Sequence, residues 1–320
     1  MHKMSQHELT NGARTSLSGL SNAAKAFLKA GPTAFRGKYQ VEGIEELRTR
    51  LRTEGDAACR RALLRHGAST RDVFFGGVRC MEVTAPPIGD SAVLFCFGGG
   101  MITGSPFEEL VITAALARYT NATVIVPYYR LAPEHPFPAA PDDVHAAYGA
   151  VAARFGRANV SIAGESAGGN LALNVLQRLE PAEQPAAVVL ISPWCDLSHQ
   201  GESHRFNAPN DPTLSTFDLR RAAKAYCGRK RRVDPRLSPL FAESFRDMPP
   251  TMITTGTYDL LLSDSLRLAE RLQAEGVSVN LRIWEALWHA FEFYEGVPEG
   301  DASLIEIGTF LRSSLSTATQ

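Results

Sequence analysis

Short apolar runs typical of β-strands alternate with helical stretches over most of this chain. The strand-like runs lie at residues 93–97, 123–126, 187–192 and 251–255, and a late one lies at 277–284. Parallel strands need a crossover connection, so regular alternation of strands and helices indicates a mainly parallel sheet that is covered on both faces. The sequence therefore predicts an α/β fold.

Two segments interrupt this alternation. Residues 1–70 read as helices that precede the sheet, and residues 196–236 read as a long polar and helical insertion. Loops and insertions at the carboxyl edge of such a sheet are where ligand sites form. We expect these two segments to form a cap over a site. The remaining residues, 71–195 and 237–320, are predicted to be the two parts of one core that opens with a hairpin at 73–83.

The stretch VSIAGESAGGNL, from Val160 to Leu171, changes from a strand-like run to a helical run at Ser166. Gly164 and Gly168 stand two positions either side of the serine, which is the GxSxG spacing of a nucleophile elbow. In such an elbow a strained turn exposes the serine oxygen at the end of a strand. A turn of small residues that only lets a strand and a helix pack closely has the same pattern. Partners for the serine must therefore decide between the two interpretations.

A serine hydroxyl is a weak nucleophile unless a base takes its proton and an acid orients that base. In one known arrangement the chain order is serine, acid, histidine, each on a loop that follows a strand. Of the eight histidines only His199, His204 and His289 follow Ser166, and only His289 follows a late strand-like run. We therefore interpret His289 as the base.

Three aspartates compete for the role of the acid. Asp259 lies on the loop after the run at 251–255 and leads into the last strand before His289, so it is preferred. Asp196 also follows a strand and is the alternative acid. Asp264 is interpreted as a carboxylate near a helix start that interacts with free N–H groups.

A charged tetrahedral intermediate needs hydrogen-bond donors where its oxygen lies. The run FGGGMITGSP, residues 97–106, follows a strand and offers the backbone N–H groups of Gly99 and Gly100. Together with the N–H of Ala167, directly after the serine, these groups are predicted to form an oxyanion hole.

The same glycine run also suits a dinucleotide-binding loop, through Gly98, Gly100 and Gly104. That fingerprint requires a carboxylate at the end of the next strand to hold a ribose. Here the next strand ends in Val126, Pro127 and Tyr128, so the dinucleotide interpretation is disfavoured.

Together these motifs resemble those of the hormone-sensitive-lipase-like esterases of the α/β-hydrolase superfamily. The family's order is kept, from about residue 70 onward, by FGGGMITGSP, YRLAPEHPFPAAPDD, GESAGGN, SPLF, GTYDLLLSD and WHAF. The resemblance implies the α/β-hydrolase fold with an eight-stranded, mostly parallel sheet and a helical cap. It also implies hydrolysis of short- to medium-chain acyl esters without a metal or cofactor. Carried over residue by residue, the nucleophile, acid, base and oxyanion donors fall on Ser166, Asp259, His289, and Gly99, Gly100 and Ala167.

The family's first loop usually reads HGGG, and here Phe97 stands in place of the histidine. Because the oxyanion donors are backbone groups, this change affects the packing of the loop and the substrate profile and leaves the donors in place. We expect Phe97 to be a buried residue at a strand end. In the YRLAPEHPFPAAPDD segment, Arg130, Glu134 and Asp142 are predicted to form a buried charge network that braces the loops.

Composition limits the kinds of binding partner and the cellular compartment that are expected for this chain. The formal net charge is only −1, which points to neither nucleic acid nor an anionic membrane, and no apolar run approaches the roughly 18 residues of a membrane span. Five scattered cysteines without a CxxC pair argue against a disulfide framework or a zinc site. No HExxH or paired-histidine motif appears, so no metal is expected, and the family resemblance implies that no cofactor is needed. The start MHKMSQHELTNG has no apolar signal-peptide core, and we expect a cytoplasmic protein.

The sequence thus predicts a serine carboxylesterase that acts on a small-molecule ester through Ser166, His289, Asp259 and a covalent acyl-enzyme. Amide, carbamate or lactone hydrolysis needs the same triad and stays open. A non-catalytic small-molecule receptor is the alternative from another class, although the receptors of this family have lost the histidine that His289 retains. The resemblance also implies a homodimer through the sheet edge near the last strand. Four aromatic residues are candidates to line the pocket or to pack the cap: Phe27, Phe35, Phe206 and Phe217.

Overall fold

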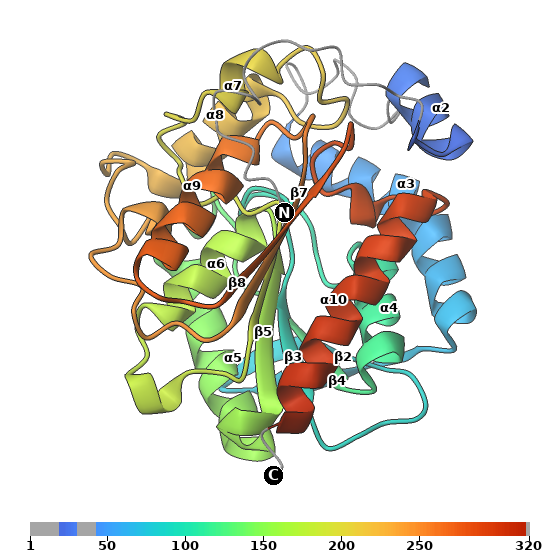
Figure 1. Ribbon diagram of the computed structural model, residues 1–320, viewed down its shortest axis with the longest axis vertical. Coiled ribbons are helices and arrows are strands. Elements are labelled where there is room, and N and C mark those ends of the chain that lie inside the picture. Colours follow the sequence, from blue (N-terminus) through green and yellow to red (C-terminus); the bar gives the residue numbers. More distant parts are fainter. Residues whose placement is uncertain (1–18, 31–42, 318–320) are drawn as a thin grey trace.

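The computed structural model describes residues 19–30 and 43–317 of the 320-residue chain. Its centre is one eight-stranded sheet in the order β1-β2-β4-β3-β5-β6-β7-β8 (Figure 1). Strand β2 pairs antiparallel with β1 and β4, and the other neighbours are parallel. The strands are β1 Ser69–Phe75, β2 Val78–Thr84, β3 Ala92–Cys96, β4 Thr123–Pro127, β5 Val160–Glu165, β6 Val188–Ile191, β7 Thr251–Gly256 and β8 Val279–Trp284. The predicted α/β fold with a mostly parallel sheet is confirmed.

The interior strands are buried along their whole length because helices cover both of their faces. Every residue of β3, β4, β5, β6 and β7 is buried, whereas the edge strands β1 and β8 are largely exposed or half-buried. A strand buried on both sides favours apolar and β-branched residues, which is the signal the sequence carries in these runs.

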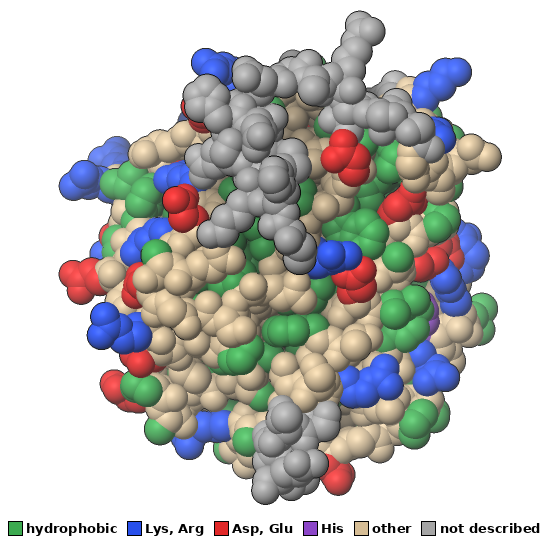
Figure 2. Space-filling view, viewed as in Figure 1, with side chains coloured by type: hydrophobic (Ala, Val, Ile, Leu, Met, Phe, Trp, Pro, Cys, Tyr) green, Lys and Arg blue, Asp and Glu red, His purple; other side chains and the backbone are tan. Residues whose placement is uncertain are grey.

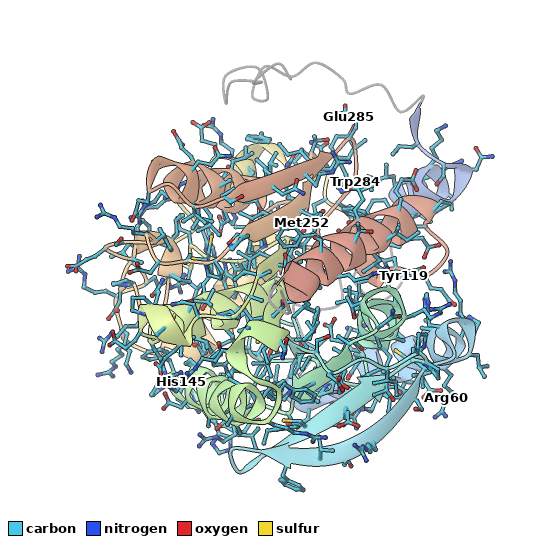
Figure 3. All side chains as sticks on the ribbon, turned by 60° about the horizontal axis from the view of Figure 1, so that its bottom comes forward. Arg60, Tyr119, His145, Met252, Trp284 and Glu285 are labelled. Atoms are coloured by element: carbon cyan, nitrogen blue, oxygen red, sulfur yellow. The ribbon has the colours of Figure 1, made fainter. Side chains whose placement is uncertain are left out.

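Helices lie on both faces of the sheet. Helices α4 and α10 cover one face, with α3 packed outside α4, and α5, α6 and α9 cover the other (Figure 1). The helices are α2 Asn22–Ala30, α3 Ile44–His66, α4 Leu110–Thr120, α5 Ala139–Phe155, α6 Ala167–Leu176, α7 Ser203–Phe206, α8 Thr216–Cys227, α9 Leu262–Ala274 and α10 Pro298–Thr317. Short 3-10 helices occupy Arg157–Asn159, Pro181–Glu183, Pro239–Phe241 and Phe291–Phe293. Figure 3 shows Tyr119 of α4 and His145 of α5 on opposite sides of the sheet.

Helices α2, α7 and α8 lie at one end of the molecule, at the top of Figure 1. Helix α2 belongs to the N-terminal segment, and α7 and α8 belong to the insertion at 196–236. Within residues 19–30 and 43–317, none of the helices combines the length and the apolar character that crossing a bilayer requires. On the face drawn in Figure 2, acidic and basic side chains of the described residues alternate without a large area of one sign.

The predicted buried network of Arg130, Glu134 and Asp142 is wrong. Arg130 pairs with Asp143 at 2.7 Å, Glu134 pairs with Arg48 of α3 at 2.9 Å, and Asp142 pairs with Arg178 at 2.8 Å. The side chains of Arg130, Glu134 and Asp142 keep about half of their surface exposed, at 51%, 45% and 52%. Glu134 and Asp142 find partners outside the segment, which no local pattern encodes, and Arg130 pairs with the second of the two adjacent aspartates, Asp143.

Candidate active site

Ser166 lies between β5 and α6 in a turn that only a surrounding fold can impose. Its φ of 52° and ψ of −116° are unfavourable for a residue with a side chain, at a cost of about 1–3 kcal/mol. A Cβ atom on Gly168 would overlap the carbonyl oxygen of Cys96, and one on Gly164 would overlap that of Gly168. Gly168 is therefore needed for α6 to start this close to β3, and Gly164 for α6 to turn this tightly away from β5. The structure gives Ser166 the geometry of a nucleophile elbow.

The structure brings Ser166, His289 and Asp259 into one hydrogen-bonded chain. His289 Nε2 lies 2.9 Å from Ser166 Oγ, and His289 Nδ1 lies 3.1 Å from Asp259 Oδ1. Since β5, β6, β7 and β8 are parallel neighbours, the loops after β5, β7 and β8 meet at one edge of the sheet. This order explains how residues separated by 123 positions come within hydrogen-bond distance.

The loop that carries Asp259 packs directly against the loop that carries His289. A Cβ atom on Gly256 would overlap the carbonyl oxygen of Leu287, so only glycine allows the approach. The Asp259 carboxylate also accepts hydrogen bonds from Thr255 Oγ1 at 3.0 Å and from the N–H of Leu261 at 2.7 Å. These bonds hold the carboxylate toward the imidazole.

Charges around His289 favour its protonated form. Burial alone would lower the pKa of His289, but Asp259 and, more weakly, Glu165 and Asp211 raise it to about 9. Burial likewise disfavours the Asp259 carboxylate, yet contact with His289 holds the pKa of that carboxyl below its usual value. This pair therefore stabilises the imidazolium that forms when the serine gives up its proton.

The two other aspartates are engaged elsewhere. Asp196 is fully buried and pairs with Arg267 at 2.6 Å. Asp264 stands in the first turn of α9, but its Oδ2 accepts hydrogen bonds from the N–H groups of Cys195 and Asp196. The expectation for Asp264 therefore needs correction, because the N–H groups it satisfies belong to the loop after β6 and not to a helix start. The geometry favours Asp259 over Asp196 as the partner of His289.

The glycine loop after β3 presents backbone N–H groups beside Ser166. Gly99 and Gly100 have φ values of 90° and 65°, which residues with side chains rarely adopt. Both glycines line the same cavity as Ser166. Within the described part of the chain, no hydrogen bond uses the N–H of Gly99, Gly100 or Ala167. Gly99 and Gly100 are therefore candidates to donate to a ligand oxygen, whereas Ala167 is buried and is not among the described residues that line the cavity.

Phe97 is buried, as expected, with 1% of its surface exposed. Strand β3 ends at Cys96, so Phe97 belongs to the loop and not to the strand. Its ring stacks on Tyr129 with centroids 3.9 Å apart, and the Tyr129 hydroxyl donates to the Phe97 carbonyl oxygen at 2.8 Å. Stacking and this hydrogen bond hold the start of the glycine loop in the absence of the family's histidine.

A cavity of about 440 Å³ lies over Ser166 and His289. Its lining includes Leu47 and Leu51 of α3 and Leu214 and Leu219 of the insertion. Of the four aromatic residues that were candidates to line the pocket, Phe27 does line the cavity, and its ring stacks on Trp288. Phe206 and Phe217 are not among the cavity-lining residues in the described part of the chain, and Phe217 is 47% exposed. Phe35 lies outside the described residues.

The sequence interpretation overlooked Glu165, which precedes the serine. Its Oε1 lies 3.6 Å from His289 Nε2, and it is 5% exposed in the wall of the cavity. Burial raises the pKa of Glu165 to about 7, although the nearby His289 opposes the shift. The signal was present in the sequence as an ionisable residue next to the predicted nucleophile. Among the described residues, no cluster of three or more His, Cys, Asp or Glu is arranged to hold a metal ion.

Comparison with known proteins supports one family. Residues 93–293 match a family model described as the alpha/beta hydrolase fold. A solved hormone-sensitive lipase from a metagenome library superposes with a TM-score of 0.84 and 34% identity, over 91% of this chain and 98% of that one. This chain belongs to the bacterial hormone-sensitive-lipase family of α/β-hydrolases. A further solved esterase of that bacterial family superposes with a TM-score of 0.81 at 29% identity, covering 92% and 97% of the two chains.

Curated relatives of this hormone-sensitive-lipase-family protein have names that describe ester hydrolysis. An esterase of Acinetobacter venetianus is 32% identical over 82% of this chain and 88% of its own length. An acetyl-hydrolase of Streptomyces hygroscopicus is 35% identical over 78% of this chain and 84% of its own length. The protein is a carboxylic ester hydrolase, and the receptor alternative is set aside.

Proposed function

We propose that this family member hydrolyses small carboxylic esters through a Ser166–His289–Asp259 triad and a covalent acyl-enzyme. The observation that carries the proposal is the continuous chain of contacts, 3.1 Å from Asp259 to His289 and 2.9 Å from His289 to Ser166. Ser166 Oγ attacks the ester carbonyl while His289 Nε2 takes its proton. The imidazolium then protonates the leaving alcohol, and water attacks the acyl-enzyme by the same route.

The oxyanion of each tetrahedral intermediate would lie against the N–H groups of Gly99, Gly100 and Ala167. Donors held in place before the reaction stabilise charge that develops only in the transition state. Removing one such donor typically costs about 10²–10³ in kcat, so the glycine loop is a major part of the proposed machinery.

We infer that residues 1–70 and 196–236 act together as a cap, with 71–195 and 237–320 as the core. Phe27 and Leu47 from the first segment and Leu214 from the second line the same cavity as Ser166. An apolar cavity of about 440 Å³ suits short- to medium-chain acyl esters. The homodimer, the cytoplasmic location and any hydrolysis of amides, carbamates or lactones stay predictions.

The proposal is tested with a series of p-nitrophenyl esters from acetate to palmitate and with a p-nitrophenyl phosphonate. We expect rapid turnover of short esters, with a fall in kcat/KM where the acyl chain outgrows the cavity. We also expect the phosphonate to abolish activity and to leave a covalent adduct on Ser166, detected by mass spectrometry of peptides. An adduct on another residue would overturn the assignment of the nucleophile.

The pH dependence follows from the pKa of about 9 for His289. Because the base must be neutral to accept the serine proton, we expect kcat/KM to rise with pH, to be half-maximal near pH 9 and to level off only above that pH. The measurement is kcat/KM for a short ester from roughly pH 6 to 10, corrected for spontaneous hydrolysis. Glu165→Gln removes a negative charge beside His289 and should move the rising limb of the kcat/KM profile, the pH range over which the rate increases, to lower pH. A flat wild-type profile over this range would contradict the prediction.

A further inference from the structure

The insertion between β6 and β7 is hydrogen-bonded to the loop that carries Asp259. Ser203, Asn207 and Asp211 are spaced four residues apart, and backbone bonds of 2.9 Å from Asn207 N to Ser203 O and from Asp211 N to Asn207 O join them in successive turns. Residues four apart in such turns share one face. All three side chains are buried, and all three bond to residues 257–263.

Of these three side chains, only that of Asn207 is hydrogen-bonded to Asp259 itself, through the backbone. Its Nδ2 donates to the carbonyl oxygen of Thr257 at 2.9 Å and to that of Asp259 at 2.8 Å. These two acceptors fix the orientation of the Asn207 amide, because its NH₂ group can donate two hydrogen bonds and its carbonyl oxygen can donate none. Asn207 therefore spans the backbone from two residues before Asp259 to Asp259 itself.

Asp211 and Ser203 hold the next residue of the same loop. Asp211 Oδ2 accepts a hydrogen bond from the N–H of Leu260 at 2.9 Å, and Ser203 Oγ donates to the Leu260 carbonyl oxygen at 2.7 Å. The other carboxylate oxygen of Asp211 accepts from the N–H groups of Thr213 and Leu214. Both polar backbone groups of Leu260 are thus satisfied by the insertion.

The same segment continues into the wall of the cavity. Thr213 and Leu214 line the cavity, and Thr213 Oγ1 lies 3.5 Å from the carbonyl oxygen of His289. One short stretch of the insertion therefore contacts the loop of the acid, the loop of the base and the space where a substrate would bind.

We propose that Asn207 is a positioning residue for Asp259, and that Asp211 and Ser203 complete this support from the insertion. The inference rests on the triad of the proposed function. Catalytic geometry has to be held within about 0.5 Å, and Asn207 adds two hydrogen bonds from the insertion to those that Thr255 and Leu261 make to the Asp259 carboxylate. The insertion is then part of the catalytic machinery as well as a wall of the substrate cavity.

The test is Asn207→Leu, which keeps similar volume, removes both donors and leaves every charge unchanged. A misplacement of about 1 Å in an active site can cost about 10²-fold in rate, so we expect kcat for a short p-nitrophenyl ester to fall about 10- to 100-fold. We expect KM to change by less than about threefold, since Asn207 is not among the cavity-lining residues described.

A pH profile separates positioning from general support of the fold. The charged or titratable groups around His289 are Asp259, Glu165 and Asp211, and Glu292 in turn interacts with Glu165 and with Asp259. Because Asn207→Leu alters none of these groups, a shift of the rising limb of kcat/KM to lower pH would report weaker contact between Asp259 and His289.

Asn159→Leu is the matched control. Asn159 Nδ2 also donates to a backbone carbonyl oxygen, that of Phe155 at 3.1 Å, but it precedes β5 at the end opposite Ser166. Rates are expressed per active site titrated with the phosphonate, and melting temperatures are measured for all variants. We expect the control to keep the wild-type kcat and pH profile.

A folded Asn207→Leu enzyme with wild-type kcat and pH profile would overturn the proposal. If that variant does not fold, Asn207→Ala is measured in the same way, and failure of both to fold would assign Asn207 to stability alone and would also overturn it. Turnover by Ser166→Ala would instead refute the triad, so failure of the proposed function can be told apart from failure of the positioning role of Asn207.

Discussion

Ser166→Ala is expected to lower kcat for a short p-nitrophenyl ester by about 10⁶-fold. The variant removes the atom that His289 Nε2 contacts at 2.9 Å and leaves only the oxyanion donors and the cavity to accelerate hydrolysis. His289→Ala should be about as severe, and the double variant should be little worse, because residues that act as one unit are strongly non-additive. Initial rates at saturating ester, on protein whose fold is checked by circular dichroism, provide the measurement.

Ser161→Ala is the matched control for this prediction. Ser161 lies on the same strand, β5, and its buried Oγ has no hydrogen-bond partner among the described residues. Removing a hydroxyl that is already unsatisfied should not reduce stability, so activity should be unchanged. If Ser166→Ala kept more than about a hundredth of the wild-type rate, Ser166 would not be the nucleophile.

Asp259→Asn is expected to lower kcat by about 10⁴-fold while leaving the shape of the site intact. An amide cannot hold His289 in the tautomer that leaves Nε2 free to accept the serine proton, and it does not stabilise the imidazolium. The pKa of His289 should fall because Asp259 is the principal group that raises it. The rising limb of kcat/KM should therefore move to lower pH, in parallel with the loss of rate.

Asp196→Asn is the control that separates the two acids considered from the sequence. Asp196 pairs with Arg267 and is buried, so its replacement should lower the melting temperature. It should leave kcat per folded molecule close to that of the wild type, since its carboxylate contacts neither His289 nor Ser166 in the described structure. Equal losses of kcat in the two variants would refute the assignment of Asp259.

The local sequence pattern was sufficient to predict the strands that are buried on both faces. The runs at 123–126 and 251–255 became β4 and β7 with one residue added at the C-terminal end, because strands covered on two sides favour apolar and β-branched residues such as Val, Ile and Thr. Ends were less accurate: β6 occupies Val188–Ile191 and not 187–192, since the pairing of neighbouring strands and not the apolar run determines where a ladder stops.

Side-chain partners were the weakest part of the sequence interpretation. The predicted network of Arg130, Glu134 and Asp142 is replaced by three separate pairs that reach α3, α5 and the end of α6. Asn207 also went unnoticed, although Ser203, Asn207 and Asp211 stand four residues apart. Polar residues at helical spacing usually face solvent, and only the position of the insertion over the Asp259 loop shows what this face contacts.

The sequence by itself determined the alternation of strands and helices, the elbow around Ser166 and the order of serine, acid and histidine. The strands, the helices and the elbow are local features, because each depends on the spacing of apolar residues or on the glycines that a tight turn requires. The order of serine, acid and histidine is read directly along the chain. Only the tertiary structure decided that His289 contacts Asp259 and that Asp196 pairs with Arg267. It also decided that Asn207, about 50 residues before the loop of the acid, is hydrogen-bonded to that loop. Such contacts depend on the order of strands in the sheet and on where the insertion packs, and no neighbouring residues encode either.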